Sequence, residues 1–308
     1  MIYKPKKKYG QHFLHDQSIL NEIIIAADLK ENDIVWEVGA GLGALTDHLL
    51  KRKIFLTIYE IDDELVPILE KKYLNFTNLN YLESNSCLLH SLLKIVHKDI
   101  LKLDWEKEIK MLTSLENLEW FYNKNGAEDV CQDHSDKQPR KIKIVTNLPY
   151  QISSPFLYKI TENNKSFDTI VMMLQKEVAK RVCAKPGNKD FGVLSLKTQF
   201  YFETHYLFEV SSDKFTPPPK VHSAVIKLVP KKDIPILQNE LFFWDVIEKS
   251  FRMKRKTLRN NLIGFLPRAL THIFDTCPPK IDLNRRGETL NETEFIDLYE
   301  YLLQFIDS

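Results

Sequence analysis

The tetrapeptide Asn147-Leu148-Pro149-Tyr150 combines an amide, a rigid proline and an aromatic ring directly after an apolar run at 142–146. The Asn147 side-chain carbonyl and the Leu148 backbone carbonyl can each accept one hydrogen of an exocyclic amine such as adenine N6. Pro149 fixes its own φ and restricts the residue before it, which sets the carbonyl direction. Tyr150 offers a face for base stacking, worth about 1–3 kcal/mol. The segment suits methylation of an aromatic amine; an Asn-Pro turn with a packing tyrosine is the alternative.

A glycine-rich turn, EVGAGLG at 37–43, joins a short apolar run to a helical pattern. Gly39 and Gly41 permit close approach of the backbone to a ligand. Glu60 ends the next apolar run, 21 residues after Gly39, where a carboxylate can accept hydrogen bonds from ribose hydroxyls. The G-x-G-x-G spacing differs from the dinucleotide-binding G-x-G-x-x-G and is the form that S-adenosylmethionine enzymes use. A glycine turn without a ligand is the alternative.

Two further positions extend the expected cofactor site. Asp99 follows a strand signal near 94–97 and can hydrogen-bond an adenine amino group, while Ile100 can pack on the ring. Ile61, next to Glu60, is expected at the same site. A solvated aspartate at a strand end is the competing interpretation of Asp99.

The proline-rich stretch FTPPPK at 215–220 predicts a stiff, extended loop. Phe215 can face Tyr150 across an extruded base, although from the residues alone a core phenylalanine is the better interpretation. Lys220 can touch a phosphate or be solvated.

The segment KSFRMKRKTLRN at 249–260 holds six cations and no acid: Lys249, Arg252, Lys254, Arg255, Lys256 and Arg259. On a helix, one face would carry four of these cations: Arg252, Arg255, Lys256 and Arg259. Six like charges predict either a phosphate-binding track or a solvated basic helix. A second cluster, Lys4 with residues 6–8, is expected to be a disordered arm that can also touch RNA.

The elements that must position these residues alternate along the first part of the chain. Helices are expected at 16–29, 44–52, 63–73 and 153–160, and strands at 33–39, 54–62, 94–97, 142–146 and 168–174. This alternation predicts crossover units and a mostly parallel sheet. Strand-like runs at 204–210 and 223–230, without a helix between them, predict an antiparallel edge.

The pattern changes to helices alone after 230–235, with expected helices at 240–251, 255–266 and 292–305. We therefore expect two domains, 1–234 and 235–308. Polar stretches near 74–92 and 111–140 are expected insertions on the surface of the first domain.

The composition is that of an ordinary globular protein: 308 residues, 44% hydrophobic, with a net charge of +1. This charge neither demands nor excludes nucleic acid. The four cysteines lie far apart, which fits neither a zinc site nor a disulfide framework. The basic N-terminus has no apolar region behind it, and no apolar run reaches the roughly 18–20 residues of a membrane span. We expect a cytoplasmic protein without a metal or a membrane contact.

Taken together, these motifs resemble the ribosomal RNA adenine N6,N6-dimethyltransferases over most of the chain apart from the two insertions. The resemblance is carried by GQHFL (10–14), EVGAGLGALT (37–46), YEID (59–62), KDI (98–100), NLPYQISSP (147–155), MLQKEVAKRV (173–182), FGVLSL (191–196), FTPPPKVHSAVIKLVP (215–230), RKTLRNNL (255–262) and RRGETL (285–290).

The resemblance implies a Rossmann-like class I methyltransferase sheet with helices on both faces and a small all-helical C-terminal domain that binds RNA. It implies S-adenosylmethionine as methyl donor and no metal. The implied reaction dimethylates two adjacent adenosines in a hairpin loop near the 3′ end of small-subunit ribosomal RNA. The implied setting is an assembling small subunit, with the enzyme acting as a monomer.

The resemblance also implies site residues. It places His12 and Leu14 at the cofactor, with Gly39, Glu60, Asp99 and Asn147, and it makes Phe215 the second half of the aromatic clamp. Many bacterial members have Asn where this chain has His12, but histidine can also form a hydrogen bond.

Three alternatives are weighed against this assignment. A large-subunit methylase of the antibiotic-resistance type shares the chemistry, but typically carries Ile in place of Leu148 and lacks the close match to RKTLRNNL. A non-catalytic transcription or assembly factor is disfavoured by the intact EVGAGLG and NLPY motifs. An NAD-dependent dehydrogenase is disfavoured by the glycine spacing and by the lack of an evident hydride-relay histidine.

Overall fold

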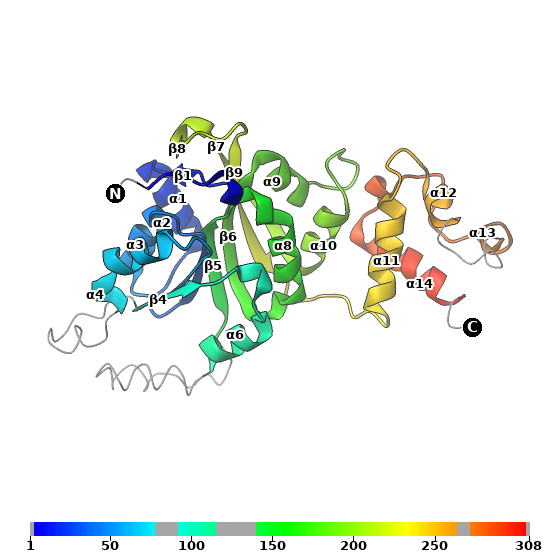
Figure 1. Cartoon of the computed structure of the whole chain (residues 1–308). Coiled ribbons are helices and arrows are strands. Elements are labelled where there is room, and N and C mark those ends of the chain that lie inside the picture. Colours follow the sequence, from blue (N-terminus) through cyan, green and yellow to red (C-terminus); the bar gives the residue numbers. More distant parts are fainter. Residues whose placement is uncertain (1–2, 78–91, 115–139, 264–271, 306–308) are drawn as a thin grey trace. The chain divides into compact units, whose positions relative to one another are not determined.

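The structure is a computed structural model that describes residues 3–77, 92–114, 140–263 and 272–305 (Figure 1). Most of the two expected insertions, 78–91 and 115–139, lies outside the described residues.

The chain divides into two compact units, Met1–Ala179 with Glu203–Pro230 and Lys180–Phe202 with Lys231–Ser308. Residues 180–202 fall within the range expected for the first domain, yet their contacts group them with the second unit. The division into folding domains at 234/235 stays a prediction.

Seven of the described strands form one sheet in the order β4-β3-β2-β5-β6-β9-β7, and the short strands β1 Phe13–Leu14 and β8 Phe215–Thr216 form a separate two-stranded sheet. The bounds of the seven are β2 Ile34–Val38, β3 Phe55–Glu60, β4 Leu92–His97, β5 Ile142–Asn147, β6 Phe167–Gln175, β7 Phe202–Val210 and β9 Ser223–Pro230. The first five are parallel, whereas β9 runs antiparallel to β6. The predictions of a mostly parallel sheet and an antiparallel strand near its edge are confirmed.

The helices of the first unit are α1 Gln17–Ala27, α2 Ala44–Leu49, α3 Leu65–Lys72, α4 Leu74–Thr77, α6 Trp105–Thr113, α8 Ser153–Glu162 and, at its border, α9 Lys176–Val182. The Asp16 side chain caps α1 by accepting hydrogen bonds from two backbone N–H groups, as predicted. Strand order runs from β2 toward β4 and then back from β5 to β6, so right-handed crossovers place helices on opposite faces. Figure 1 shows α1, α2 and α3 on one side of the sheet and α6 and α8 on the other.

The core of the first unit follows from the continuous burial of its central strands. All five residues of β2 are buried, as expected for a strand covered on both faces. Trp36 packs edge-to-face against Tyr59, Trp105 and Phe167, with ring centroids 5.2, 5.4 and 6.1 Å away. This packing fixes the strands whose carboxyl ends carry the motifs.

The second unit is helical, with α10 Val193–Tyr201, α11 Glu240–Phe251, α12 Leu258–Ile263, α13 Ile273–Thr276 and α14 Glu292–Leu303. Phe200, Phe243 and Tyr299 meet in its core. The Asn291 and Glu294 side chains form a capping box at the start of α14.

The basic segment is not one continuous helix. The helix expected at 240–251 is present as α11, and the one expected at 255–266 begins only at Leu258, as α12, with residues 264–266 outside the described part of the chain. Helix α11 ends at Phe251, and residues 252–257 form bends and turns before α12. The buried Asn261 side chain reaches back to this segment: its amide nitrogen donates to the carbonyl oxygens of Ser250 (2.9 Å) and Met253 (3.3 Å), and its oxygen accepts from Met253 N (3.2 Å). These bonds satisfy backbone groups in the last turn of α11 and just beyond it, and they allow the chain to turn.

Candidate active site

A cavity of about 870 Å³ lies in the first unit, lined by segments that follow the carboxyl ends of β2, β3, β4 and β5 and by part of the N-terminal segment. The structure brings all of the predicted cofactor residues to its wall: His12, Leu14, Gly39, Gly41, Glu60, Ile61, Asp99, Ile100 and Asn147. The volume is within the range of small-molecule sites, about 300–1,000 Å³.

The position of the cavity follows from the topology of the sheet. β2 and β5 are parallel neighbours, with Trp36 opposite Ile144, and the strand order reverses between them. In open α/β sheets, ligands bind outside the carboxyl ends of strands at such a switch point. The glycine-rich loop after β2 and the NLPY segment after β5 therefore lie together, and a Cβ on Gly39 would stand 3.1 Å from the Pro149 ring.

Gly41 cannot be replaced without movement of its neighbours. Its φ of +60° lies in the left-handed region, and a Cβ would approach the Phe13 ring to 2.8 Å. Phe13 belongs to the segment that forms the opposite wall of the cavity. The glycine therefore keeps space between the loop and the N-terminal segment.

Glu60 is buried at the end of β3 and faces the glycine loop. Its carboxylate accepts hydrogen bonds from the backbone N–H groups of Gly41 (3.2 Å), Ile61 (2.9 Å) and Asp62 (3.0 Å). Burial raises the pKa of Glu60, while the backbone bonds from Asp62, Gly41 and Ile61 oppose that change. A carboxylate offers about four acceptor positions, so this one retains capacity for a ligand hydroxyl.

Glu37 is a second buried carboxyl at the cavity. It is part of the EVGAGLG motif, but the sequence analysis assigned it no role. Its side chain, 1% exposed, accepts a hydrogen bond of 2.7 Å from the Thr46 hydroxyl. Burial raises its pKa to about 8. The signal that could have found it is an acidic residue inside a fully apolar strand.

Asp99 and Ile100 line the cavity from the end of β4. The Asp99 side chain accepts a hydrogen bond from Leu101 N (3.0 Å) and caps a short 3-10 turn, Ile100–Lys102. The Ile100 carbonyl accepts from Trp105 Nε1 (2.8 Å). Asp99 is thus held by its own turn beside the cavity.

Asn147 is the last residue of β5 and is partly exposed to the cavity. Within the described part of the chain, its side-chain amide has no hydrogen-bond partner. Leu148 is buried and donates from its N–H to the Met173 carbonyl (3.3 Å). The fixed backbone and the unpartnered amide suit the capture of a polar ligand group.

Tyr150 lies in the cavity wall and is held by two contacts. Its hydroxyl is 2.5 Å from the Ser223 hydroxyl. Its ring stacks on His12, with centroids 5.9 Å apart and planes at 27°. The His12 ring is held by a hydrogen bond of 2.7 Å from Nδ1 to the Pro217 carbonyl. Burial raises the pKa of Tyr150 and the bond to Ser223 opposes it, so the hydroxyl stays protonated at neutral pH.

The structure does not bring Phe215 to the cavity. Phe215 is 2% exposed and packs in the core cluster that includes Leu14 and Val225. The reason is a short antiparallel pairing of β1 Phe13–Leu14 with β8 Phe215–Thr216, in which Leu14 lies opposite Phe215. The expected clamp of Phe215 facing Tyr150 is therefore not formed, and the core interpretation fits.

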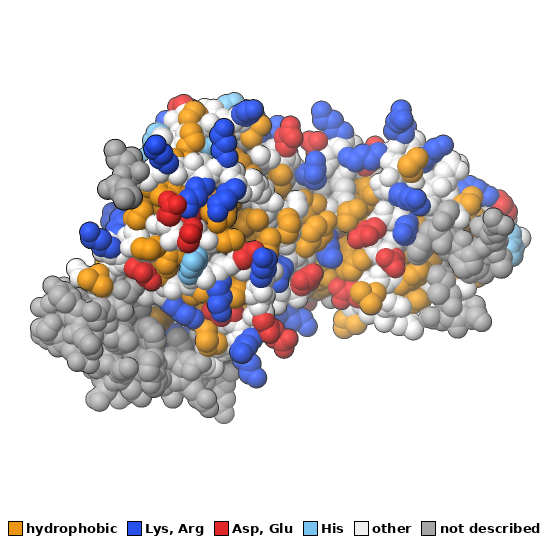
Figure 2. Space-filling view, in the orientation of Figure 1, with side chains coloured by type: hydrophobic (Ala, Val, Ile, Leu, Met, Phe, Trp, Pro, Cys, Tyr) orange, Lys and Arg blue, Asp and Glu red, His pale blue; other side chains and the backbone are white. Residues whose placement is uncertain are grey.

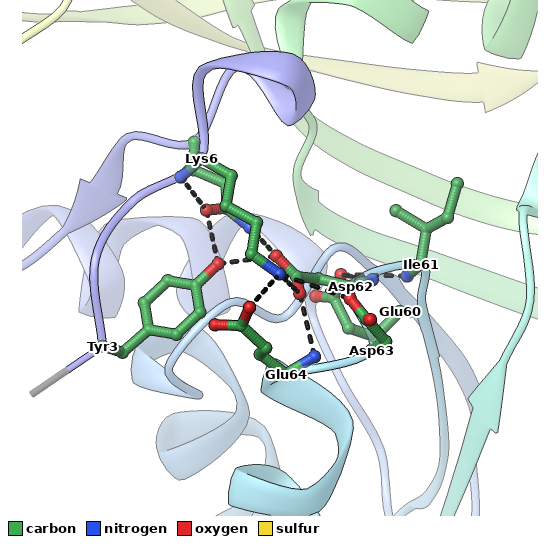
Figure 3. A network of polar contacts seen from close by, with 8 residues as sticks. Tyr3, Lys6, Glu60, Ile61, Asp62, Asp63 and Glu64 are labelled. Carbon is green, nitrogen blue, oxygen red and sulfur yellow. Dashed lines mark hydrogen bonds and ion pairs between the residues drawn. The ribbon is translucent and has the colours of Figure 1, made fainter. Parts of the chain in front are cut away.

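The N-terminal segment is also ordered, contrary to the expected disordered arm. Figure 3 shows Lys6 and Tyr3 converging on Asp62, at the loop after Glu60. Lys6 Nζ is 2.6 Å from Asp62, Tyr3 donates to it at 2.6 Å and Gln11 at 2.8 Å. Burial acts to raise the pKa of Asp62, but these donors hold it well below its usual range. The network ties residues of two cavity walls together.

The predicted RNA-contact residues do not line the cavity, and all of them except Lys220 belong to the second unit. Figure 2 shows Lys and Arg side chains gathered over the α11–α12 segment. Arg259 is bound within the second unit: both Asp275 carboxylate oxygens accept hydrogen bonds of 2.7 Å from its guanidinium. Lys220 is exposed on the loop before β9.

The described residues hold neither a cluster of metal-ligating side chains nor a helix that could span a membrane. No group of three or more His, Cys, Asp or Glu side chains there could hold a metal ion. None of the helices in those same ranges has the length and apolarity to cross a bilayer.

Comparison with known proteins identifies the chain's relatives. The family model "Ribosomal RNA adenine dimethylase" matches residues 2–304. The chain is 36% identical over 298 residues to ribosomal RNA small subunit methyltransferase A of Geobacillus sp. (95% of this chain, 90% of that one). It is 33% identical over 299 residues to the protein of the same name from Francisella tularensis subsp. novicida (97% and 98%).

Two solved structures share the fold. A dimethyladenosine transferase from Plasmodium falciparum has a TM-score of 0.66 at 24% identity, covering 96% of this chain and 97% of that one. The 23S rRNA methyltransferase ErmE has a TM-score of 0.62 at 22% identity, covering 95% and 100%. At these identities they support the Rossmann-like methyltransferase fold alone. The sequence matches go further, and the chain belongs to the ribosomal RNA adenine dimethylase family.

Proposed function

We propose that the protein transfers methyl groups from S-adenosylmethionine to N6 of two adjacent adenosines in a hairpin loop near the 3′ end of small-subunit ribosomal RNA, giving N6,N6-dimethyladenosines. The observation that carries the proposal is the convergence, in one cavity, of the glycine loop, Glu60, Asp99 and the unpartnered Asn147 amide. Family membership and relatives named as small-subunit methyltransferases support the same reaction.

The cofactor half of the cavity fits an adenosine joined to an amino acid. Glu60 keeps acceptor capacity for ribose hydroxyls, and Asp99 with the apolar Ile61 and Ile100 would hold the adenine. Gly39 and Gly41 leave the loop backbone open to the ligand. His12 and Leu14 close the cavity from the N-terminal side. S-adenosylmethionine supplies an electrophilic methyl group on a sulfonium.

The acceptor half is formed by the NLPY segment. N6 of adenine is a weak nucleophile because its lone pair is delocalised into the ring. The Asn147 side-chain carbonyl and the Leu148 backbone carbonyl would each accept one N6 hydrogen, which favours a pyramidal nitrogen, and Tyr150 would stack on the base. No strong general base is needed, because the nitrogen becomes acidic only once it is methylated. The rate gain comes from alignment of the reacting atoms.

The RNA backbone is the proposed partner of the basic segment and Lys220. In the segment, Arg252, Lys254, Arg255 and Lys256 have no ion pair among the described residues. Lys249 precedes them at the end of α11. Arg259 would have to exchange Asp275 for a phosphate. We infer that an assembling small subunit is the substrate and that the enzyme acts as a cytoplasmic monomer.

The competing function is methylation of large-subunit RNA, because ErmE shares the fold. Purified protein should be incubated with labelled S-adenosylmethionine and, in parallel, small-subunit particles, large-subunit particles and their naked RNAs. We expect label in small-subunit RNA, at two neighbouring adenosines that are unmodified in cells lacking the gene. Label confined to large-subunit RNA, or no transfer to any substrate, would overturn the proposal.

A further inference from the structure

We propose that Ser223 is a positioning residue for the methyl-transfer reaction and acts through Tyr150, whose ring it holds in the orientation that receives the target base. The inference rests on the proposed function, because it assumes that Tyr150 stacks on that base. Ser223 itself does not line the cavity.

Ser223 is a rigid anchor. It is the first residue of β9, lies opposite Gln175 of β6 and is fully buried. The preceding carbonyl, of His222, accepts a hydrogen bond of 2.9 Å from Lys176 N. Tyr150 instead begins a short 3-10 turn, Tyr150–Ile152, in the loop after β5. The bond of 2.5 Å between the two hydroxyls therefore ties a ring on a loop to a strand of the sheet.

The rest of the segment before Ser223 supports the same role. Phe215 is anchored in the core at one end of the proline-rich stretch, and Ser223 is anchored in the sheet at the other. Between them, the Pro217 carbonyl holds the His12 ring that stacks on Tyr150. The FTPPPKVHS segment thus contacts the Tyr150 ring both directly and through His12. In this structure it orients the ring and does not supply a second aromatic wall.

Ring orientation matters because Tyr150 and Asn147 act on one base. If stacking fixes the plane of the base while Asn147 and Leu148 hold its amine, then a tilted ring moves the nitrogen away from the methyl group. Small misplacements of a reacting atom reduce the rate strongly. The proposed contacts of Glu60, Asp99 and the glycine loop with the cofactor lie on other segments of the wall, so binding of the cofactor should be largely unaffected.

The test uses Ser223→Ala, Tyr150→Phe and the double variant, in the full-length protein. Each single change removes the same hydrogen bond, so kcat/KM for small-subunit particles should fall by about three- to tenfold in each. The double variant should be no worse than the more damaged single variant, because the shared bond can be lost only once. Cofactor affinity, measured by calorimetry, should stay at the wild-type value.

Ser153→Ala is the matched control. Ser153 is also a buried serine of the first unit, but within the described residues its hydroxyl has no hydrogen-bond partner. Its removal should leave kcat/KM unchanged. A second readout is the split between kcat and KM for small-subunit particles. A tilted Tyr150 ring misplaces the reacting nitrogen, so Ser223→Ala should lower kcat, whereas a loss of RNA binding alone would raise only KM.

The outcomes separate this inference from the proposed function. If the wild type methylates small-subunit RNA but Ser223→Ala matches it, or if the two single effects multiply in the double variant, the positioning role is wrong. If Ser223→Ala lowers only the melting temperature, Ser223 is merely structural. If Ser223→Ala does not fold, Tyr150→Phe breaks the same bond from the cavity side, and wild-type rates in that variant would overturn the role. A wild type without methyl transfer rejects both.

Discussion

The cavity of the first unit and the basic segment of the second were both predicted from charged and polar motifs, but they turned out differently. The cavity collects residues from segments as far apart as His12 and Asn147, and every predicted cofactor residue lies in its wall. The basic segment is contiguous in sequence, yet residues 252–257 form a loop where one helical face was expected, and Arg259 is bound to Asp275. Strand ends in a parallel sheet are fixed by the topology, whereas the conformation of the charged run depends on contacts such as those of the Asn261 side chain, which the pattern of charges does not reveal.

The strongest test of the cavity is Asn147→Ala. If the amide carbonyl holds the reacting amine, its loss should lower kcat by about 10²–10³, the range seen when one preorganised polar contact is removed. Cofactor affinity should stay largely intact. Single-turnover methyl transfer at saturating cofactor measures the effect. Near-normal turnover in this variant would remove Asn147 from the acceptor site.

The next effect concerns Glu60 and binding. Glu60→Ala should weaken cofactor affinity by about 10- to 100-fold, because hydrogen bonds to a charged group contribute roughly 1.5–3 kcal/mol. Calorimetry measures the dissociation constant directly. The variant also frees three backbone N–H groups, so its folding should be checked by circular dichroism. An unchanged affinity in a folded variant would contradict the ribose assignment.

The stability of the folded protein should depend on pH through the buried carboxyl of Glu37. The unfolded carboxyl of Glu37 titrates near pH 4.3, and the folded one has a pKa of about 8. Between these values the folded state binds the extra proton, so stability should fall as pH rises, by at most roughly 1.4 kcal/mol per pH unit. Urea unfolding across this window measures the slope.

Glu37→Gln is the control for that slope. Neighbouring Glu60, Asp47 and Lys72 also act on the Glu37 carboxyl, and they remain in the variant. A flatter pH dependence in Glu37→Gln assigns the slope to Glu37. An identical slope in both proteins would show that other groups cause it.

The smallest expected effect belongs to single charges of the basic segment. Arg255→Gln should lower RNA affinity a few-fold and reduce the slope of log K against log salt by about 0.7, the value for one contact with a single strand. Arg259→Gln should change the slope less, because Asp275 already binds that guanidinium. Filter binding over a salt series compares them. Equal changes would mean that Arg259 leaves Asp275 for RNA.

Much of the fold was predictable because, in the first unit, the spacing of apolar residues and the positions of turn-forming residues indicate the same elements. The short apolar runs that end in Gly39, Glu60 and Asn147 indicated strands followed by loops. Their alternation with helices indicated a parallel sheet whose strand order reverses at one point. For Phe215 the residues alone favoured a core position, which the structure shows, and it was the family resemblance that implied a clamp facing Tyr150. The burial of Phe215 depends on the pairing of β1 with β8, two short strands about 200 residues apart.

Residues that act at a distance were also beyond prediction. Ser223 is an ordinary strand residue until the sheet places it 2.5 Å from Tyr150. The helical prediction for the basic segment was wrong for a related reason. Helix α11 ends where the buried Asn261 side chain bonds to the backbone of Ser250 and Met253, across the loop. Helix propensities of single residues cannot predict such a contact between separate segments.

The anchoring of Tyr3 and Lys6 to Asp62 has a practical consequence for work with this enzyme. An affinity tag fused immediately before Tyr3 would lie next to this anchor and to the wall of the cavity that Tyr3 lines. Such a handle could pull the segment from its anchor or shield the entrance, and a kinetic defect measured on that preparation would belong to the tag. Purification handles are better attached away from this segment.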